Sequence, residues 1–554
     1  MTDALFFLDQ HGCAKNQVDA ELIIGIMRDI GWSRTDEPER AALIIVNSCG
    51  FIEPAKKESL DAVIEARAAY PAAKILLAGC LAERYANDLA GTLVEADAFF
   101  GNGDLSRLPE VIDSLFGQGF ASAHSATRDV ALQAPGVAPD SLAHVQGPEG
   151  GASYPVGLYA QEGVCSGERP ELLSFPRSAY VKITEGCDNR CAFCAIPLIR
   201  GSLRSRPSTE IAEECRSLVA RGVWELNLIG QDLASYGKGL EDARVNEPSD
   251  NPGSAGDQKA PMSSHINPQM SPLAGLLQAI SALEGDFRVR LLYLHPDNFP
   301  SDILPVMAKD RRFYPYFDIP FQSGAASVLP RMNRRGNPAQ YLSLVADIRA
   351  AFRESPYRTA ALRTTFLVGF PGESDADFEE TLRFCREVRS LWSGAFVWSR
   401  EEGTKASEMK GRVPKKTAQA RLAAIQEAQR RITPHELEAF VGADVEVLVE
   451  EIIPDEADSS ETADASEATA ARVDASTPAD LSFPARGERG PDGIPASRLA
   501  LGRAWFQAPE VDGSVVLQFE DGQLDLTRKA IEPGSVVMAR IIAVNGVDVE
   551  AVVR

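Results

Sequence analysis

Short apolar runs alternate with amphipathic stretches over residues 1–118. Four of the runs predict strands, and the first three are each followed by a stretch with helical periodicity. The predicted strands are Leu5–Leu8, Leu43–Val46, Lys74–Ala78 and Ala96–Phe100, and the predicted helices are Asp19–Ile30, Pro54–Arg67 and a segment from Ala82. Because strands that alternate with helices form a parallel sheet covered on both faces, we predict an N-terminal parallel-sheet α/β domain.

Residues 119–176 carry many Gly, Pro, Ser and Ala residues and show little periodicity in their apolar positions. Such a composition predicts a linker or an irregular insertion. Cys165 lies in this stretch, in a segment flanked by Gly163 and Gly167. We therefore expect Cys165 to be an exposed thiol on a mobile segment.

The alternation of apolar runs and amphipathic stretches resumes over residues 177–436. Helical stretches such as Thr209–Arg221, Ala339–Phe352 and Asp375–Arg389 separate the runs. The predicted strands are Tyr180–Thr184, Glu225–Ile229, Arg290–Leu294, Phe317–Ile319, Thr364–Val368 and Ala395–Trp398. Six such units predict an open partial barrel, (β/α)6, whose functional site lies at the carboxyl ends of the strands.

One stretch interrupts this pattern. Residues 239–271 are rich in Ser, Pro, Gly, Asn and Asp, which predicts a disordered insertion. Two cysteines of the same region, Cys215 and Cys385, share the apolar faces of predicted helices. We expect both of these thiols to be core residues.

The tail, residues 437–554, changes to short β-like runs joined by glycine-containing turns. The predicted strands are Val445–Val449, Gly502–Phe506, Ser514–Gln518, Val536–Ile541 and Val547–Val552. They predict a small all-β barrel. Residues 454–497 interrupt it with an acidic stretch rich in Ala, Ser and Thr, which we expect to be a disordered insertion.

Composition limits the kinds of protein this chain can be. Its 56 basic and 79 acidic residues give a net charge of −23, which argues against broad contact with a nucleic-acid backbone. We expect a cytoplasmic protein without a membrane segment, because the chain starts without a secretory signal and has no long apolar run. In that compartment its nine cysteines are expected to be metal ligands or catalytic groups rather than disulfides.

Three cysteines, Cys187, Cys191 and Cys194, lie within eight residues, directly after the first predicted strand of the barrel. Thiolates suit iron–sulfur clusters, zinc and copper(I). A structural zinc site or an ordinary 4Fe–4S cluster takes four protein ligands, whereas this loop supplies three. The spacing therefore suggests a cluster with one iron open to a small molecule, and we interpret this triplet as the catalytic centre.

Three more cysteines each follow a predicted strand of the first domain: Cys13, Cys49 and Cys80. The carboxyl ends of the strands in an open parallel sheet lie along one edge, where ligands bind. Thiols that are far apart in the sequence should therefore meet at that edge. We predict a second three-cysteine cluster there.

The spacing Cys187-x3-Cys191-x2-Cys194, with the aromatic Phe193 before the third cysteine, resembles the signature of the radical S-adenosylmethionine (SAM) superfamily. Together with Cys13, Cys49 and Cys80 it resembles the methylthiotransferases. The resemblance implies two 4Fe–4S clusters, one on each triplet, with SAM on the open iron of the Cys187 cluster. It also implies an electron donor such as flavodoxin or ferredoxin.

The resemblance extends over nearly the whole chain and is strongest to the family members that methylthiolate the β-carbon of an aspartate in ribosomal protein S-twelve. The similar segments are Gly12–Asp19, Asn47–Ile52, Gly79–Tyr85, Glu185–Gly201, Glu225–Leu228, Gln231-Asp232, Leu292–Pro296, Arg363–Phe366, Val368–Glu373 and Glu401–Thr404. Ala508–Gly513 and their position resemble the family's TRAM domain. The departures are His11, Ala20 and Phe321-Gln322-Ser323, and they leave all six cysteines in place.

Other residues of these segments have two interpretations. Phe193, Gln231, Asp232 and Gly369 are candidate contacts to SAM. Gln231 and Asp232 could instead lie in a surface turn, and Gly369 could serve backbone geometry. Arg200, Arg204 and Arg206 are candidate contacts to cofactor or substrate, or a solvated basic run. We assign no role to His295.

Three functions remain open from the sequence. The first is a protein-directed methylthiotransferase, and the second is the related activity on a modified adenosine near the anticodon of tRNA. Outside its insertion the tail has more acidic than basic residues, which favours a basic ribosomal protein over a polyanion. The third is an iron–sulfur electron carrier, which would need four thiolates per cluster.

Overall fold

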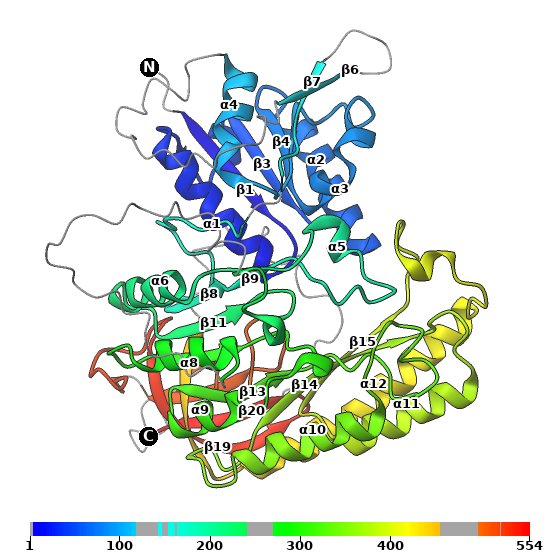
Figure 1. The fold of residues 1–554 in the computed structure, drawn as a ribbon. Helices are drawn as coiled ribbons and strands as arrows, with labels where there is room; N and C mark the ends of the chain where they lie inside the picture. Colours follow the sequence, from blue (N-terminus) through cyan, green and yellow to red (C-terminus); the bar gives the residue numbers. More distant parts are fainter. Residues whose placement is uncertain are drawn as a thin grey trace, which may run out of the picture.

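The computed structural model describes residues 4–117, 142–146, 153–160, 163–240, 270–454, 497–520 and 522–554. Figure 1 shows an N-terminal sheet domain, a central sheet flanked by helices, and a C-terminal β-barrel at the opposite end of the molecule. Most of the two insertions expected at 239–271 and 454–497 lies outside the described residues.

The N-terminal domain is the predicted α/β domain. Its main strands are β1 (Leu5–Gln10), β3 (Leu43–Ser48), β4 (Lys74–Gly79) and β5 (Ala98–Phe100), which pair in parallel in that order. The other early elements are β2 (Ser33–Arg34), α1 (Ala14–Asp29), α2 (Glu53–Ala69), α3 (Cys80–Leu89) and α4 (Leu108–Phe116). All residues of β3 are buried, as expected for a parallel strand that is covered on both faces.

The linker predicted over 119–176 is partly wrong. Within the described residues, β6 (Ala143–Gln146) and β7 (Ser153–Gly157) extend the first sheet to seven strands in the order β2-β1-β3-β4-β5-β7-β6. β7 pairs in parallel with β5 and antiparallel with β6. Pro155 and Gly157 weaken the strand signal in the sequence, so the pairing with β5 decides the structure.

Cys165 is not an exposed thiol. It packs, half-buried, against the core, and its Sγ lies 3.8 Å from the carbonyl oxygen of Gly103. Burial raises the pKa of this thiol. The exposed thiol expected from the sequence is therefore wrong, because the glycine-rich segment around it lies against the first domain.

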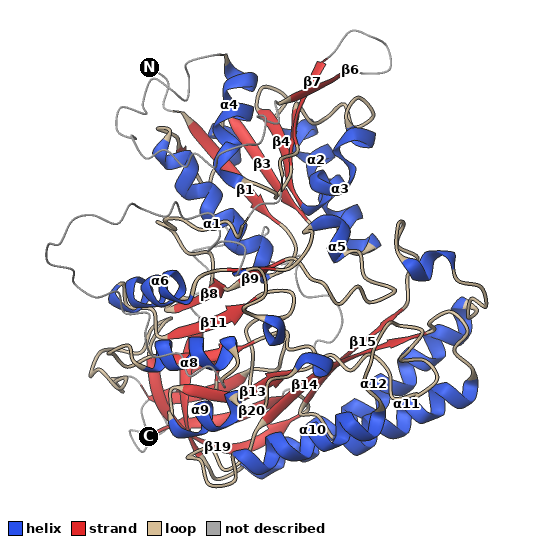
Figure 2. Cartoon of the chain, in the orientation of Figure 1, coloured by secondary structure: helices blue, strands red, loops and turns tan. Residues whose placement is uncertain are grey.

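The central sheet is the predicted open partial barrel (Figure 2). In the described part of the chain its six parallel strands follow sequence order: β8 (Ser178–Lys182), β11 (Glu225–Ile229), β12 (Arg288–Leu291), β13 (Phe313–Asp318), β14 (Ala361–Val368) and β15 (Trp392–Val397). Its helices are α5 (Ile196–Ile199), α6 (Ser208–Ala220), α8 (Pro272–Ser281), α9 (Ile303–Lys309), α10 (Pro338–Ala351), α11 (Asp375–Val388) and α12 (Lys415–Leu437). Cys215 and Cys385 are fully buried in its core, as predicted.

Short elements complete the connections. A two-stranded sheet joins β9 (Thr184–Glu185) to β10 (Arg204–Ser205). The 3-10 helices are η1 (Pro38–Arg40), η2 (Leu105–Arg107), η4 (Leu233–Ser235), η5 (Pro296–Asn298), η6 (Lys405–Glu408) and η7 (Glu438–Phe440).

The tail forms the predicted small barrel, which is closed. Its strands are β16 (Asp444–Ile453), β17 (Ser497–Arg503), β18 (Val515–Glu520), β19 (Val536–Asn545) and β20 (Asp548–Val553), in the order β16-β17-β18-β20-β19. The strand expected at Gly502–Phe506 instead ends at Arg503. The residues that follow pack against the central sheet, where the carbonyl oxygens of Trp505 and Phe506 accept hydrogen bonds from Arg290 and Trp392.

A buried ion group joins the barrel to the central sheet. Glu225, the first residue of β11, pairs with Arg290 of β12 at 2.8 Å and with Arg503 of β17. All three side chains are buried. Although burial opposes the charged carboxylate, the two guanidinium groups lower the pKa of Glu225 to about 2.

Arg503→Met is expected to lower the free energy of unfolding by about 3–5 kcal/mol, because it removes one partner of a buried ion group. Since the pKa of Glu225 falls from 4.5 to about 2 on folding, its stabilisation is present above pH 4.5 and is lost as the pH falls toward 2. Urea unfolding at pH 7 and pH 4 measures both effects. Arg528→Met, at an exposed barrel arginine, is the control, and equal stability of the two variants would contradict the assignment.

Candidate functional site

The carboxyl ends of the N-terminal sheet face the central sheet (Figure 1). Cys13 follows β1 and precedes α1, Cys49 directly follows β3, and Cys80 directly follows β4 and begins α3. The parallel topology thus brings the three strand ends to one edge, as predicted from the sequence. Close approach at that edge needs Gly79, whose φ is +88° and where a Cβ would lie 2.6 Å from Asn47 Oδ1.

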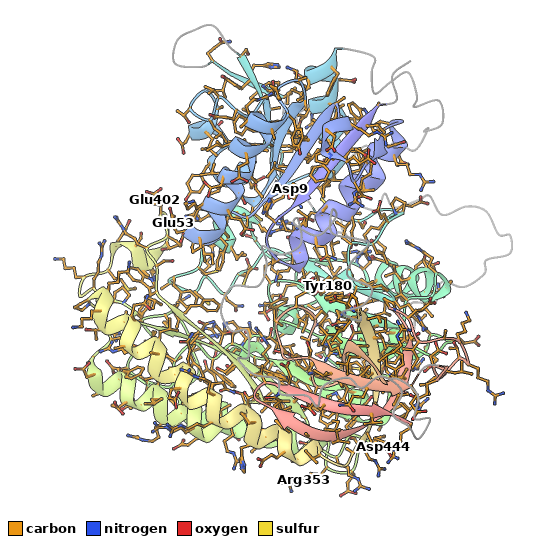
Figure 3. All side chains as sticks on the ribbon, turned by 180° about the vertical axis from the view of Figure 1, so that it is seen from behind. Asp9, Glu53, Tyr180, Arg353, Glu402 and Asp444 are labelled. Carbon is orange, nitrogen blue, oxygen red and sulfur yellow. The ribbon has the colours of Figure 1, made fainter. Side chains whose placement is uncertain are left out.

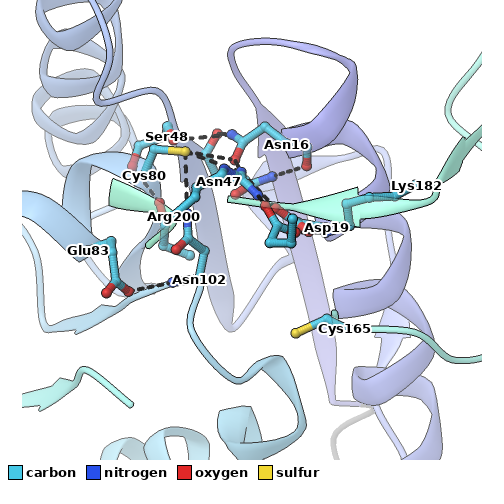
Figure 4. A network of polar contacts seen from close by, with 12 residues as sticks. Asn16, Asp19, Asn47, Ser48, Cys80, Glu83, Asn102, Cys165, Lys182 and Arg200 are labelled. Carbon is cyan, nitrogen blue, oxygen red and sulfur yellow. Dashed lines mark hydrogen bonds and ion pairs between the residues drawn. The ribbon is translucent and has the colours of Figure 1, made fainter. Parts of the chain in front are cut away.

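Polar side chains surround the sulfur of Cys80 (Figure 4). Arg200 Nη2 donates to Cys80 Sγ at 3.2 Å and Asn102 Nδ2 donates to it at 3.4 Å. Asn16 Oδ1 lies 3.7 Å from the same sulfur. Donors directed at a sulfur stabilise its thiolate form, which is the form that binds metal.

The thiols of this triplet influence one another electrostatically. Burial raises the pKa of Cys49 to about 12, and the charges of Cys80 and Cys13 act in the same direction against a backbone hydrogen bond from Phe51. Burial also raises the pKa of Cys80, where Cys13 again adds and Arg200 opposes. Bound iron would relieve this repulsion, because a metal cation keeps its thiol ligands deprotonated.

The second triplet lies in a tightly held loop. Gly186, with φ at +75°, precedes Cys187, and a Cβ on it would lie 2.1 Å from the carbonyl oxygen of Ser202. Burial raises the pKa of Cys187 to about 11 and that of Cys194 to about 12, and the charge of Cys191 raises both further. The three thiols of this loop therefore also share one site.

The donor chemistry of both triplets fits iron–sulfur clusters. Within the described ranges, no group of three or more Cys, His, Asp or Glu side chains is arranged to hold a single metal ion. Thiolates that bind a cubane cluster attach to different irons and need not converge on one point. Each triplet offers three thiolates, one fewer than a structural zinc site takes, so the residues present fit a cluster with one open iron.

The Asp232 side chain is bonded to the loop that carries the second triplet. Its carboxylate is buried and accepts hydrogen bonds from side chains and backbone N–H groups of the neighbouring loops. The donors are Asn189 Nδ2 at 2.8 Å, Asn298 Nδ2 at 3.0 Å, Ser235 Oγ at 2.6 Å, Ala234 N at 3.0 Å and His295 N at 3.1 Å. Because Asn189 Nδ2 also lies 3.5 Å from Cys187 Sγ, these bonds hold the cysteine loop in place.

The other candidates have different surroundings. Gln231 Nε2 donates to Glu185 Oε1 at 3.2 Å, whereas Gln231 Oε1 is buried without a partner among the described residues. That free acceptor could receive a donor from a cofactor. Phe193 packs beside Phe370 in a small apolar cluster next to the loop.

The position of Gly369 has a backbone explanation. Its φ is +73°, and a Cβ there would lie 2.7 Å from the Cβ of Ala418. Its N–H donates to Glu373 Oε2 at 2.7 Å. These contacts explain why glycine is needed at the turn after β14 without requiring a contact to cofactor.

His295, to which the sequence assigned no role, lies at the site. Its Nε2 is 3.9 Å from Cys191 Sγ, and its backbone N–H donates to Asp232. Burial, with the charge of Arg334, lowers the pKa of His295 to about 4, so the ring is neutral at pH 7. In the sequence, His295 directly follows a predicted strand, but many histidines with a purely structural role occupy such positions.

The three candidate arginines behave differently. Arg200 is buried and reaches Cys80, whereas Arg206 donates to Glu214 and to the carbonyl oxygen of Lys182. Arg204 donates to backbone carbonyl oxygens, including that of Ser202 at 2.8 Å. Of the three, only Arg200 connects the two cysteine triplets.

The short segment from Cys194 to Arg200 joins the two sites. It contains α5, and Ala195 and Ile199 pack against Cys80 of the other triplet. The four residues of α5 span about 6 Å, so the segment is short enough to keep the triplets at one interface. The structure thus brings together two motifs that are more than a hundred residues apart in the sequence.

Ion pairs close this interface on both sides. Asp19 of α1 pairs with both Lys182 and Arg200. On the far side, Lys56 and Arg84 share Glu401 Oε2, at 2.9 Å and 3.0 Å. Figure 3 shows the adjoining Glu402 close to Glu53 of α2 at this junction.

Among the described helices, none is both long enough and apolar enough to cross a membrane.

Family models match three parts of the chain. Residues 5–101 match "Uncharacterized protein family UPF0004", residues 181–385 match "Radical SAM superfamily", and residues 492–553 match "TRAM domain". A solved radical S-adenosylmethionine methyltransferase, TsrM from Kitasatospora setae, is 13% identical with a TM-score of 0.47, covering 73% of this chain and 77% of its own.

Curated relatives extend the similarity to the full chain. "Ribosomal protein uS12 methylthiotransferase RimO" of Treponema denticola is 49% identical over 547 residues, covering 98% of this chain and all of its own. The protein of the same name from Desulfosudis oleivorans is 36% identical and covers 91% of each chain. At this identity and coverage, the chain belongs to the RimO family of radical SAM methylthiotransferases.

Proposed function

We propose that this chain adds a methylthio group to the β-carbon of an aspartate in ribosomal protein uS12. The proposal includes two 4Fe–4S clusters, one on Cys13, Cys49 and Cys80 and one on the Cys187 loop, with SAM on the second. The names of its relatives support the substrate. An electron donor such as flavodoxin or ferredoxin, and a reducing cytoplasm, complete the proposal.

The observation that carries the proposal is the juxtaposition of the two triplets. Residues Ala195 and Ile199, which directly follow the Cys187 loop, pack against Cys80. A carbon atom held at this interface would lie between a radical-generating centre and a second sulfur-bearing centre. Transfer of a methylthio group needs both centres within reach of one substrate atom.

The protein's own residues position and shield this reaction. When bound, SAM and its cluster supply a carbon-centred radical that removes hydrogen from an unactivated carbon. Asp232 and Asn189 hold the cysteine loop, and the free oxygen of Gln231 can orient a bound cofactor. The ion pairs of Asp19 and Glu401 hold the two domains together, which helps to exclude water.

In this proposal Arg200 positions Cys80 of the first triplet relative to the second domain. Its Nη1 donates to Glu185 at 2.7 Å, and its Nη2 donates to Asp19 at 2.8 Å and to Cys80 Sγ. One planar guanidinium thus ties the second domain to a cysteine of the first triplet. Lysine cannot reproduce this fork of donors.

The proposed substrate also agrees with the charge of the tail. The described barrel strands carry more acidic than basic residues, although Asp444 is paired with Arg540 and Arg554. A basic ribosomal protein complements such a net charge better than a polyanion does. Methylthiolation of tRNA is the alternative activity, and the deletion-strain experiment below measures it as well.

Iron content tests the cluster assignment. Anaerobic reconstitution of the full chain should give roughly eight irons per chain, and roughly four in Cys80→Ala or Cys191→Ala. Cys80→Ala should still cleave SAM, whereas Cys191→Ala should not. Cys165→Ser is the matched control, with the full iron content. A Cys191→Ala protein that cleaves SAM would refute the catalytic assignment.

Mass spectrometry of a deletion strain tests the substrate. Ribosomal protein uS12 should lose the methylthio mass at one aspartate, while bulk tRNA keeps its modifications. The wild-type gene should restore the mass and a Cys191→Ala gene should not. Unchanged uS12 together with altered tRNA would replace the proposal with the tRNA activity.

Arg200→Lys tests the positioning role. Because contacts around metal ligands tune activity, we expect about 10–100-fold less methylthiolated product per 5′-deoxyadenosine formed. Iron content and SAM cleavage should stay near wild type, since the Cys187 loop is intact. A wild-type ratio of methylthiolated product to 5′-deoxyadenosine in this variant would show that Arg200 only stabilises the fold.

A further inference from the structure

Lys15 differs from the other buried cations at the interface of the two domains. Lys182 and Arg200 pair with Asp19 and Glu185, and Arg169 pairs with carboxylates of its own. Lys15 is only 8% exposed, yet no carboxylate in the described part of the chain lies within ion-pair distance of it. Its charge faces the Tyr293 side chain and the Cys13 thiol instead of a carboxylate, and a buried ammonium in such a place is a candidate for binding an anion.

Lys15 is directed toward the catalytic ends of the central strands. It lies in the first turn of α1, two residues after Cys13. Its Nζ is 3.3 Å from the centroid of the Tyr293 ring, and Tyr293 follows β12 at the carboxyl end of that strand. The ammonium therefore lies between the first cysteine triplet and the open end of the partial barrel.

The backbone of Tyr293 is held in an unusual conformation. Its φ is +68°, which is rare for a bulky residue and unfavourable unless the surrounding structure enforces it. The carbonyl oxygen of Tyr293 accepts a hydrogen bond from Leu233 N at 3.0 Å, which helps to fix this turn. The strained turn presents the ring to Lys15, and the aromatic face offsets part of the cost of the buried charge.

We propose that the Lys15 ammonium binds the carboxylate of the aspartate that is methylthiolated. This inference rests on the proposed function, and it names the group that recognises the substrate. The β-carbon of an aspartate is bonded directly to its carboxyl carbon. A carboxylate held by Lys15 would therefore bring that carbon beside Cys13 and its triplet.

The proposal concerns the charged group of the substrate. A lysine ammonium binds a carboxylate or a phosphate, and the aspartate carboxylate is the group that would place the reacting carbon next to Cys13. Arg200 cannot do this, because its donors are already bonded to Glu185, Asp19 and Cys80. Lys15, by contrast, has no carboxylate partner among the described residues, and its ammonium contacts the Tyr293 side chain alone among the aromatic rings described.

Binding of two peptides tests the inference on the reconstituted full chain with SAM present. Both carry the uS12 sequence around the target, one with aspartate and one with asparagine at that position. The wild-type protein should bind the aspartate peptide about tenfold more tightly, as a charged hydrogen bond requires. Lys15→Met should bind both with nearly equal affinity, and Lys15→Arg should keep part of the preference.

Controls separate recognition from folding. Lys57→Met, at an exposed lysine of α2, should keep the wild-type preference. Lys15→Met should keep iron content and SAM cleavage, and its Tm should not fall, because methionine fills the space without an unpaired charge. A lower Tm or a loss of iron would assign Lys15 a structural role and overturn the inference.

The outcomes also separate this inference from the proposed function. If the wild type prefers aspartate and Lys15→Met does so equally, Lys15 is not the recognition group and the proposed function stands. If the wild type binds neither peptide and uS12 is unmodified in cells, the proposed function and this inference both fail.

Discussion

The arrangement of this protein depends on a charge-balanced group buried between its first two domains. Asp19 and Glu185 contribute two carboxylates, and Lys182 and Arg200 contribute two cations, all of them buried. The cations lower the pKa of Glu185, so the group stays ionised despite its burial. Removing either domain would leave charges without partners, which is strongly unfavourable in a dry interface. The group therefore determines how the two cysteine triplets face each other.

A second buried ion group lies at the opposite end of the central sheet. Strand β11 begins at Glu225, which anchors the C-terminal barrel through Arg503, and it ends just before Gln231 and Asp232. The amino ends of the strands thus hold an accessory domain, while their carboxyl ends hold the candidate site. This division leaves the catalytic face free for the N-terminal domain and for substrate.

Within the N-terminal interface, most polar groups are already committed to one another. Asp232 is saturated by donors from the surrounding loops, and Arg200 is shared between both domains. Polar groups that can still form a hydrogen bond or an ion pair therefore indicate where a ligand would bind. The oxygen of Gln231 and the ammonium of Lys15 are two such groups, and they differ in charge and position. One suits a donor on a cofactor, and the other suits an anionic substrate.

The sequence by itself determined the main architecture and the positions of the six cysteines relative to the strands. Period and composition predicted the six strands of the central sheet and β1, β3, β4 and β5 of the first sheet, and a parallel topology places Cys13, Cys49 and Cys80 at one edge whatever the details of packing. Tertiary structure decided the rest. It placed β7 beside β5 and packed the half-buried Cys165 against the core. Among the described residues it left Lys15 without a carboxylate, while Arg200 gained two. Periodicity is a local property that a sequence displays, whereas the partners of a buried side chain come from distant segments and exist only in the folded chain.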